Sequence, residues 1–169
     1  SDVCSSDLGV EFSSCPPHVA RLFEGAECVD IDGVLLAARR RKDPDELALL
    51  RTAIAATGAM VETARRLIHP GVTELEIFSA LQAAAVTACG EMLTGTGNDY
   101  ACGVRGGPPR PRACQAGELY ILDLGPAFRG YFADTCRTIA VDGRPTDAQA
   151  AAAERVREAL AIEIGRAHV

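Results

Sequence analysis

The stretch Glu118–Val141, ELYILDLGPAFRGYFADTCRTIAV, decides the fold that this sequence predicts. β-branched and aromatic residues flank Gly125-Pro126, a pattern that predicts two β-strands joined by a tight turn at this pair. The side chains of a strand alternate between its two faces. On the first strand, one face is expected to carry Leu119, Ile121 and Asp123, and the other Tyr120, Leu122 and Leu124. On the second strand, one face carries Phe132, Asp134, Cys136 and Thr138.

The two aspartates of this predicted hairpin are the candidate functional residues. An ionised carboxylate within an apolar strand is costly to bury unless it is paired or binds a metal ion. Asp123 and Asp134 lie one on each strand, at a spacing that lets both point into one pocket. A surface hairpin with solvated aspartates is the alternative, but the apolar context ILDLG around Asp123 favours metal binding.

The composition narrows the class of protein. A length of 169 residues and a hydrophobic share of 48% fit a globular domain with a substantial core. The net charge of −6 gives no reason to expect nucleic acid as a partner, and no apolar run approaches the ~20 residues of a membrane span. Seven scattered cysteines without a C-x-x-C pair indicate reduced thiols and a cytoplasmic protein.

The two ends of the sequence are related at the level of the codons that can encode them. A DNA string that encodes Ser1–Leu8 has a reverse complement that reads Ile164–Val169 and then a stop codon. That string resembles a sequencing adapter translated at both ends. We therefore expect residues 1–8 and 164–169 to be adapter-derived, and the segment between them to be an internal piece of a longer reading frame.

Three helices are expected around the hairpin. Asp43, Pro44 and Glu46 form a start signal for a long helix that ends near residue 69. Thr73 with Glu76 starts a second helix that ends at Cys89-Gly90, and Thr146 with Gln149 starts a third. The apolar stripe of the first helix is expected to comprise Leu47, Leu50, Ile54, Val61, Arg65 and Ile68, and that of the second Leu75, Phe78, Leu81, Ala85 and Val86. Residues 28–36 are expected to form a strand.

The segment Thr94–Arg112 is rich in glycine and proline. It lacks the Gly-Lys-Ser/Thr ending of a phosphate-binding loop. It is predicted to be either a long exposed connection or the wall of a pocket above the hairpin, since loops of this length are often functional. Tyr100 and Arg105 are the candidate substrate-pocket residues on it.

The order of these elements resembles the pita-bread-fold metallopeptidases, on the motifs KDPDELALLR, HPGVTELEIFSALQ, GELYILDLG and RGYFADTCRT. That family includes methionine aminopeptidases, Xaa-Pro aminopeptidases, prolidases and creatinase, and the similarity is greatest to Xaa-Pro aminopeptidase-like proteins. The resemblance implies an α+β fold, the truncated first half of a pita-bread domain with helices packed on an antiparallel sheet. Residues 39–163 would form that half, and residues 9–38 the end of a creatinase-type domain.

The resemblance also implies a site and a reaction. Asp123 would chelate one metal ion and Asp134 would bridge two, with manganese, cobalt or zinc as candidates. The family completes its site with one histidine and two glutamates from the second half of the fold, so the site is expected to be incomplete and this fragment inactive. The parent would hydrolyse the N-terminal bond of peptides, favouring Xaa-Pro, with a hydroxide held between two ions.

Two other functions stay open for the parent. A creatinase-like hydrolase of a C–N bond uses no metal, and the two aspartates argue against it. A non-catalytic pita-bread module that binds peptides or proteins is favoured by Cys102–Gly107, where family peptidases usually carry a histidine and this sequence has none. A homodimeric parent is compatible with the resemblance.

Overall fold

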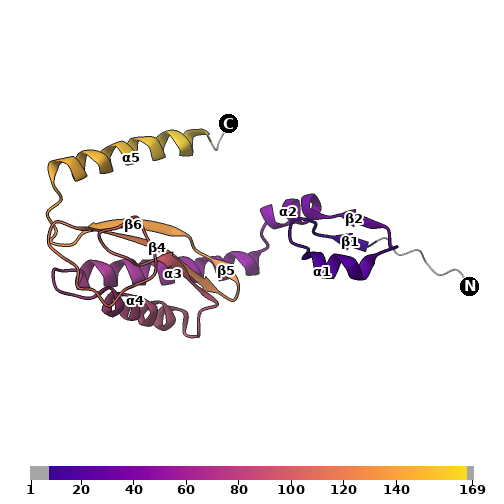
Figure 1. Ribbon diagram of the computed structural model, residues 1–169, viewed down its shortest axis with the longest axis horizontal. Coiled ribbons are helices and arrows are strands. Elements are labelled where there is room, and N and C mark those ends of the chain that lie inside the picture. The colour runs from indigo at the N-terminus through magenta and orange to yellow at the C-terminus, as the bar shows by residue number, and fades with distance from the viewer. Residues whose placement is uncertain (1–7, 167–169) are drawn as a thin grey trace, which may run out of the picture. The chain divides into compact units, whose positions relative to one another are not determined.

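The computed structural model describes residues 8–166 (Figure 1). Apart from Leu8 and the backbone of residues 164–166, the two predicted adapter segments lie outside the described residues. The chain divides into two compact units, Ser1–Leu47 and Ala48–Val169.

The first unit is small and holds a two-stranded parallel sheet. Its elements are β1 (Leu8–Val10), α1 (Pro17–Ala20), the 3₁₀-helix η1 (Arg21–Phe23), β2 (Cys28–Asp30) and α2 (Asp32–Arg40). The predicted strand over residues 28–36 is wrong beyond Asp30, because the chain turns into α2 there. The Asp30 carboxylate accepts a hydrogen bond from the Asp32 amide at 2.9 Å, so an aspartate expected on a strand face instead closes a turn at the helix start. The predicted domain boundary at 38/39 lies inside α2.

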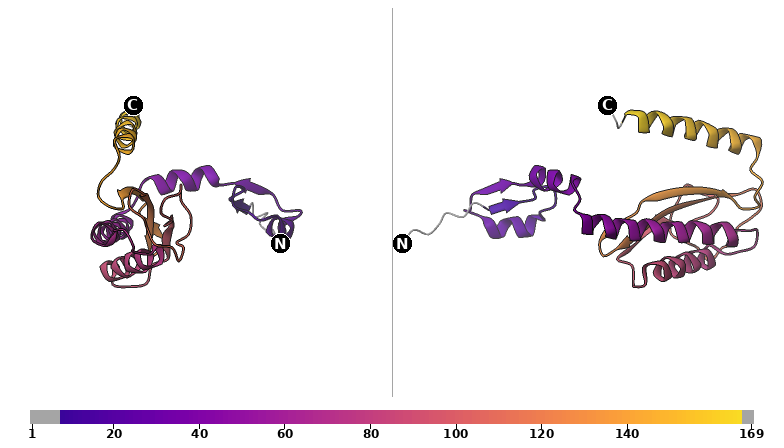
Figure 2. Two further views of the ribbon diagram at one scale, coloured as in Figure 1. Left: turned by 60° about the vertical axis from the view of Figure 1, so that its left-hand side comes forward. Right: turned by 180° about the vertical axis from the view of Figure 1, so that it is seen from behind.

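The second unit contains an antiparallel sheet and two helices that cover one of its faces (Figures 1 and 2). Its elements, together with the helix that leads into it, are α3 (Pro44–Leu67), α4 (Glu74–Cys89), β3 (Gly95–Asp99), β4 (Leu119–Phe128), β5 (Tyr131–Phe132), β6 (Thr135–Ala140) and α5 (Asp147–Arg166). Strand β4 is central and pairs with β3, β5 and β6. The predicted α+β class, with helices packed on an antiparallel sheet, is confirmed.

The alternation predicted for β4 is also confirmed. Tyr120, Leu122 and Leu124 are fully buried and belong to one core cluster with residues of both helices, among them Met60 and Leu81. Their neighbours on the other face, including Asp123, are half-buried. The helices therefore cover one face of β4, and Asp123 lies on the opposite face.

The turn of the hairpin lies four residues later than predicted. Strand β4 runs through Gly125-Pro126, and the chain reverses at Arg129 (φ 51°) and Gly130 (φ 86°). Two consecutive positive φ angles match the turn that suits the right-handed twist of paired strands. Pro126 is tolerated inside the strand because the pairing of β4 with β3 shifts register there, so the missing amide hydrogen falls at an irregularity of the ladder.

The buried face of α3 differs from the predicted stripe of bulky residues. Ile54 is 60% exposed, whereas the residues that face the core are mostly alanine and threonine, with one methionine: Ala53, Ala56, Thr57, Met60, Thr63 and Ala64. Small residues let a helix approach its neighbours closely, an advantage that a search for bulky apolar residues misses. Among the described residues, α3 is the one helix long and apolar enough to cross a membrane by length and composition alone, a test that core helices also pass.

The helix starts agree with the sequence. The Thr73 hydroxyl accepts from the Glu76 amide at 3.2 Å while the Glu76 carboxylate accepts from the Thr73 amide at 2.8 Å, the predicted capping box of α4. Gly90, with φ 72°, ends that helix. Thr146 and Gln149 make the same reciprocal pair at the start of α5. The predicted stripe of α4 is partly wrong, because Leu75 and Val86 are about 40% exposed and Ile77 takes their place in the core.

Candidate functional site

Both predicted metal-binding aspartates line one pocket of about 400 Å³ on the sheet face away from the helices. Asp123 comes from the middle of β4, and Asp134 from the link between β5 and β6. The other residues of the lining are small or apolar: Gly95, Thr96, Gly97, Gly125 and Phe132. The hairpin therefore brings the two carboxylates together, as the sequence predicts.

A third carboxylate lies beside them, and the sequence did not indicate it. Asp99 of β3 is paired across the sheet with Asp123, which is paired in turn with Cys136 of β6. Directly opposite residues of an antiparallel pair share a face, so these three side chains form one row. The Asp99 carboxylate accepts a hydrogen bond from the Gly107 amide at 2.6 Å. Its position could be found only by recognising residues 95–99 as a strand, and their two glycines and three polar residues hide that.

The pocket carries uncompensated negative charge. Burial raises the pKa of Asp123, and the neighbouring negative charges of Asp134 and Asp99 raise it further. The carboxyl groups of Asp123 and Asp134 are close enough to share a hydrogen bond. Among the residues that the structure describes, neither forms an ion pair with a lysine, arginine or histidine. A bound cation would relieve this repulsion.

The two carboxylates fit part of a divalent-metal site. Carboxylate oxygens are ligands for manganese and similar cations. Within the described part of the chain, however, no group of three or more histidine, cysteine, aspartate or glutamate side chains could hold a metal ion. Among the described residues, Asp123 and Asp134 therefore form at most a partial ligand set.

Glycines bring β3 against β4 at the pocket. Gly97 has φ 94°, and a Cβ placed on it would lie 2.4 Å from the Asp123 carbonyl oxygen and 2.5 Å from the Gly125 amide nitrogen. Only glycine fits this combination of positive φ and close backbone contact. The first residues of the segment Thr94–Arg112 thus form a strand and a wall of the pocket, the second of the two predicted alternatives.

Tyr100, a predicted substrate-pocket residue, lies behind this wall. Its side chain is 1% exposed and packs edge-on against Phe78, with ring centroids 4.9 Å apart. Its hydroxyl donates to the carbonyl oxygen of Thr96, which lines the pocket. Burial raises the pKa of Tyr100 to about 12, and the charge of Asp123 contributes. The structure therefore places Tyr100 as a support of the pocket wall.

Arg105, the other predicted substrate-pocket residue, is exposed and lines a separate hollow of about 450 Å³. Ile121 of β4 also lines this hollow, and it lies two residues before Asp123. The structure thus places Arg105 and the aspartate pair in different hollows, both of which reach β4.

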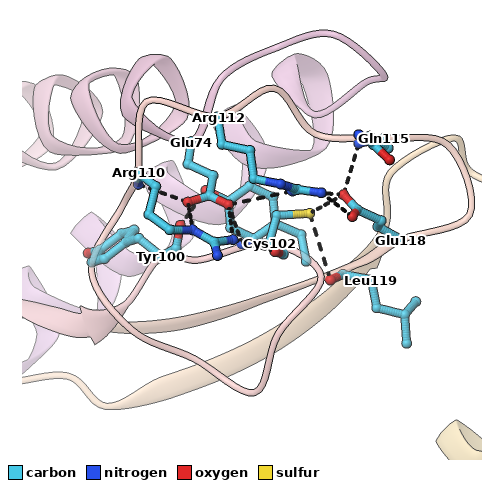
Figure 3. Close-up of polar contacts among 9 residues, drawn as sticks. Glu74, Tyr100, Cys102, Arg110, Arg112, Gln115, Glu118 and Leu119 are labelled. Atoms are coloured by element: carbon cyan, nitrogen blue, oxygen red, sulfur yellow. Dashed lines mark hydrogen bonds and ion pairs between the residues drawn. The ribbon is translucent and has the colours of Figure 1, made fainter.

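The segment that follows β3 is held by a buried carboxylate that the sequence analysis did not single out (Figure 3). Glu74, in the first turn of α4, is fully buried. It accepts hydrogen bonds from the Cys102 amide at 2.9 Å, from the Arg110 amide at 2.8 Å and from the Arg110 guanidinium at 2.6 and 2.9 Å. Burial acts to raise the pKa of Glu74, but the hydrogen bonds from Arg110 and Cys102 outweigh it and the pKa is lowered. These hydrogen bonds tie Cys102 and Arg110, at two points of the loop, to helix α4.

A second ion pair holds the end of the same segment next to the start of β4. The guanidinium of Arg112 makes two hydrogen bonds to the Glu118 carboxylate, which also accepts from the Gln115 amide at 2.9 Å (Figure 3). The bonds from Arg112 lower the pKa of Glu118 to about 2, against the opposite effect of burial. Glu118 immediately precedes β4, so this pair anchors the strand that carries Asp123.

The ion pair of Glu118 is expected to stabilise the folded chain, and acid should remove this stabilisation. Because the pKa of Glu118 in the folded chain lies below its ordinary value of 4.5, the contribution is complete above that pH and is lost as the pH falls toward 2. Urea unfolding should show Glu118→Gln to be less stable than the wild type at pH 7, with the difference shrinking by pH 2.5. Glu158→Gln, at an exposed glutamate of α5, should show no such pH dependence. A difference for Glu118→Gln that is constant with pH would contradict this.

Comparison with known proteins identifies the family. The sequence profile described as metallopeptidase family M24 matches residues 48–168. The chain belongs to metallopeptidase family M24. This confirms the resemblance to the pita-bread metallopeptidases that the sequence motifs indicated. No curated protein matches the chain.

Solved structures of prolidases and an Xaa-Pro dipeptidase show the same fold. The prolidase from Pyrococcus furiosus is 24% identical, with a TM-score of 0.77 over 91% of this chain and 47% of its own. The prolidase from Pyrococcus horikoshii OT3 is 26% identical, with a TM-score of 0.75 over 91% and 46%. The Xaa-Pro dipeptidase from Bacillus anthracis is 25% identical, with a TM-score of 0.68 over 84% and 41%. This chain thus spans less than half the length of these relatives and corresponds to the first half of their fold.

Proposed function

We propose that the full-length protein to which this chain belongs is a metal-dependent aminopeptidase that hydrolyses the N-terminal bond of Xaa-Pro peptides. The observation that carries the proposal is the pair Asp123 and Asp134, which meet in one pocket without a cationic partner among the described residues of an M24 member. Its structural relatives, among them two prolidases and an Xaa-Pro dipeptidase, support the substrate class.

In this proposal Asp123 and Asp134 hold two divalent cations, with further ligands supplied by the second half of the fold. When bound, such cations polarise a carbonyl group and activate water for attack on it. The remaining residues of this chain give the site its shape. The backbone of Gly97 and Gly125 leaves room beside Asp123, and the buried Glu74 fixes the loop that follows the pocket wall. Manganese is the first cation to test, with cobalt and zinc as the others.

A non-catalytic binding module remains the second candidate function. It is favoured by the loop Cys102–Gly107, which contains no histidine, and by the described residues, among which no group of three or more histidine, cysteine, aspartate or glutamate side chains could hold a metal ion. Such a module would bind peptides through the same pocket without hydrolysing them.

Hydrolysis of a dipeptide panel by the full-length protein separates the two candidates. With added manganese, the aminopeptidase should cleave Leu-Pro faster than Leu-Ala and should lose activity after chelation of the metal. The isolated chain of 169 residues should bind manganese weakly and show no hydrolysis, because two carboxylates fall short of the four to six ligands that a divalent cation needs. Binding of the dipeptides without turnover by the full-length protein would contradict the proposal and favour the binding module.

A further inference from the structure

Asp99 is a carboxylate of the candidate site for which the metal-binding pair gives no role. It lies directly opposite Asp123 across the sheet. Within the described part of the chain it forms no ion pair. Its carboxylate instead accepts a hydrogen bond from the Gly107 amide at 2.6 Å. Asp99 therefore joins the row of Asp123 to a distant point of the loop that follows β3.

Two hydrogen bonds close residues 100–107 into a loop whose ends meet at β3. One is the bond from the Gly107 amide to Asp99. In the other, the Gly107 carbonyl oxygen accepts from the Tyr100 amide at 2.8 Å. Both polar groups of the Gly107 backbone are thus bound at the end of the strand, and the side chain of Asp99 supplies one of the two contacts.

The Gly106-Gly107 pair makes this closure possible. Gly106 has φ 147° and Gly107 has φ 124°, values that residues with a side chain rarely adopt. A Cβ on Gly106 would lie 2.6 Å from Oδ1 and 2.7 Å from Oδ2 of Asp99, so the carboxylate packs against the glycine backbone. A side chain at Gly106 would therefore push the loop away from Asp99.

The tip of the closed loop lies in the hollow next to the metal pocket. Val104 and Arg105 line that hollow together with Ile121 of β4. Ile121 lies two residues before Asp123 on the same face of the strand, a separation of about 7 Å at the rise of a strand. Among the residues that the structure describes, Arg105 forms no ion pair, so its guanidinium is available to a substrate held beside the metal pocket.

From this geometry we propose that Asp99 is a positioning residue of the candidate site. Its carboxylate holds the Gly106-Gly107 end of the loop against β3 and thereby keeps Arg105 beside the metal pocket. The inference rests on the proposed aminopeptidase function and deepens it, because it assigns substrate affinity to a side chain that binds neither metal nor substrate. A carboxylate suits this task, since a charged oxygen accepts a stronger hydrogen bond from a backbone amide than a neutral oxygen does.

Steady-state hydrolysis of Leu-Pro by the full-length protein tests this role. Asp99→Ala should raise KM about 10-fold, the scale of one lost hydrogen bond to a charged group, and should leave kcat within about 2-fold. Asp99→Asn keeps an oxygen acceptor and should recover most of the loss. Gly106→Ala keeps the carboxylate but displaces the loop, so it should raise KM as well.

Asp32→Ala is the matched control. The Asp32 carboxylate also accepts a hydrogen bond from a backbone amide, that of Ser13 at 2.9 Å, but it lies in the first unit. This variant should change neither KM nor kcat. An unchanged KM in Asp99→Ala, or an equal rise in Asp32→Ala, would overturn the positioning role and leave the aminopeptidase intact.

A double-mutant cycle with Arg105→Ala shows how Asp99 acts. If Asp99 acts by placing Arg105, the double variant should have a KM close to that of Arg105→Ala alone. Effects that multiply would show that the two residues act independently and would overturn the proposal. A fall in kcat or in bound manganese for Asp99→Asn would also overturn it, since Asp99 would then be a metal ligand.

Hydrogen exchange gives a readout that does not depend on turnover. In the full-length protein, the Gly107 amide should exchange about 10-fold faster in Asp99→Ala than in the wild type. The Gly71 amide, which donates to the Cys114 carbonyl oxygen, should be unchanged. Unaltered exchange at Gly107 would overturn the positioning role. If the wild type hydrolyses no Xaa-Pro dipeptide, the proposed function fails, and the role of Asp99 in substrate affinity fails with it.

Discussion

Replacing Asp134 with asparagine in the full-length protein is expected to lower kcat/KM for Leu-Pro by about 1,000-fold or more, which corresponds to about 4 kcal/mol of transition-state stabilisation. An amide is neutral and offers one oxygen, so it cannot bridge two cations as a carboxylate does. Steady-state hydrolysis with saturating manganese measures the effect, and metal analysis of the purified variant should show a lower metal content.

Asp147→Asn is the matched control for this substitution, because it makes the same change in the first turn of α5, away from the pocket. Its activity should stay within about 2-fold of the wild type. Full activity in Asp134→Asn, or an equal loss in both variants, would remove Asp134 from the site.

Replacing Glu74 with alanine is expected to lower the free energy of unfolding by about 3 kcal/mol. The substitution leaves the Cys102 amide without its acceptor and the Arg110 guanidinium without its counter-ion, both beside the core. Because Arg110 is 39% exposed, water restores part of the loss, which keeps the expected value at the lower end for broken buried pairs. Urea unfolding of the chain at pH 7 measures it.

Glu62→Ala provides the control for Glu74. Glu62 pairs with Arg65 at 2.8 Å on the surface of α3, where both side chains are more than 60% exposed. Exposed pairs of this kind contribute ~1 kcal/mol or less, so this variant should be close to the wild type. Equal destabilisation by the two substitutions would show that Glu74 does not hold the loop.

The sequence predicts the alternation of β4 and the helix starts well because the signals for them are local. Capping pairs such as Thr73 with Glu76 act within four residues, and alternation along β4 needs only the strand itself. The turn at Arg129 and Gly130 was missed because Gly125-Pro126 is the stronger turn signal in isolation. Only the register shift between β3 and β4 makes room for that proline inside a strand.

Part of the site was predicted, because only some of its residues stand out in the local sequence. Asp123 and Asp134 stand out because each interrupts an apolar or aromatic run. Asp99 and Glu74 do not, since their importance comes from partners far away in the sequence: Asp99 faces Asp123 across the sheet, and Glu74 binds Arg110. Such contacts depend on tertiary packing, which no local pattern of residues specifies. The same holds for Phe132, whose place in the pocket follows from strand register.

The most direct test of the central claim, that Asp123 and Asp134 bind a divalent cation, is paramagnetic broadening of the NMR spectrum of this chain by manganese. The amide signals of Gly97 and Gly125, which line the pocket with the two aspartates, should broaden at the lowest manganese concentrations. In the double variant Asp123→Asn with Asp134→Asn they should broaden no earlier than the rest of the spectrum. Early broadening of Gly97 and Gly125 that persists in the double variant, or its absence from the wild-type chain, would contradict the account.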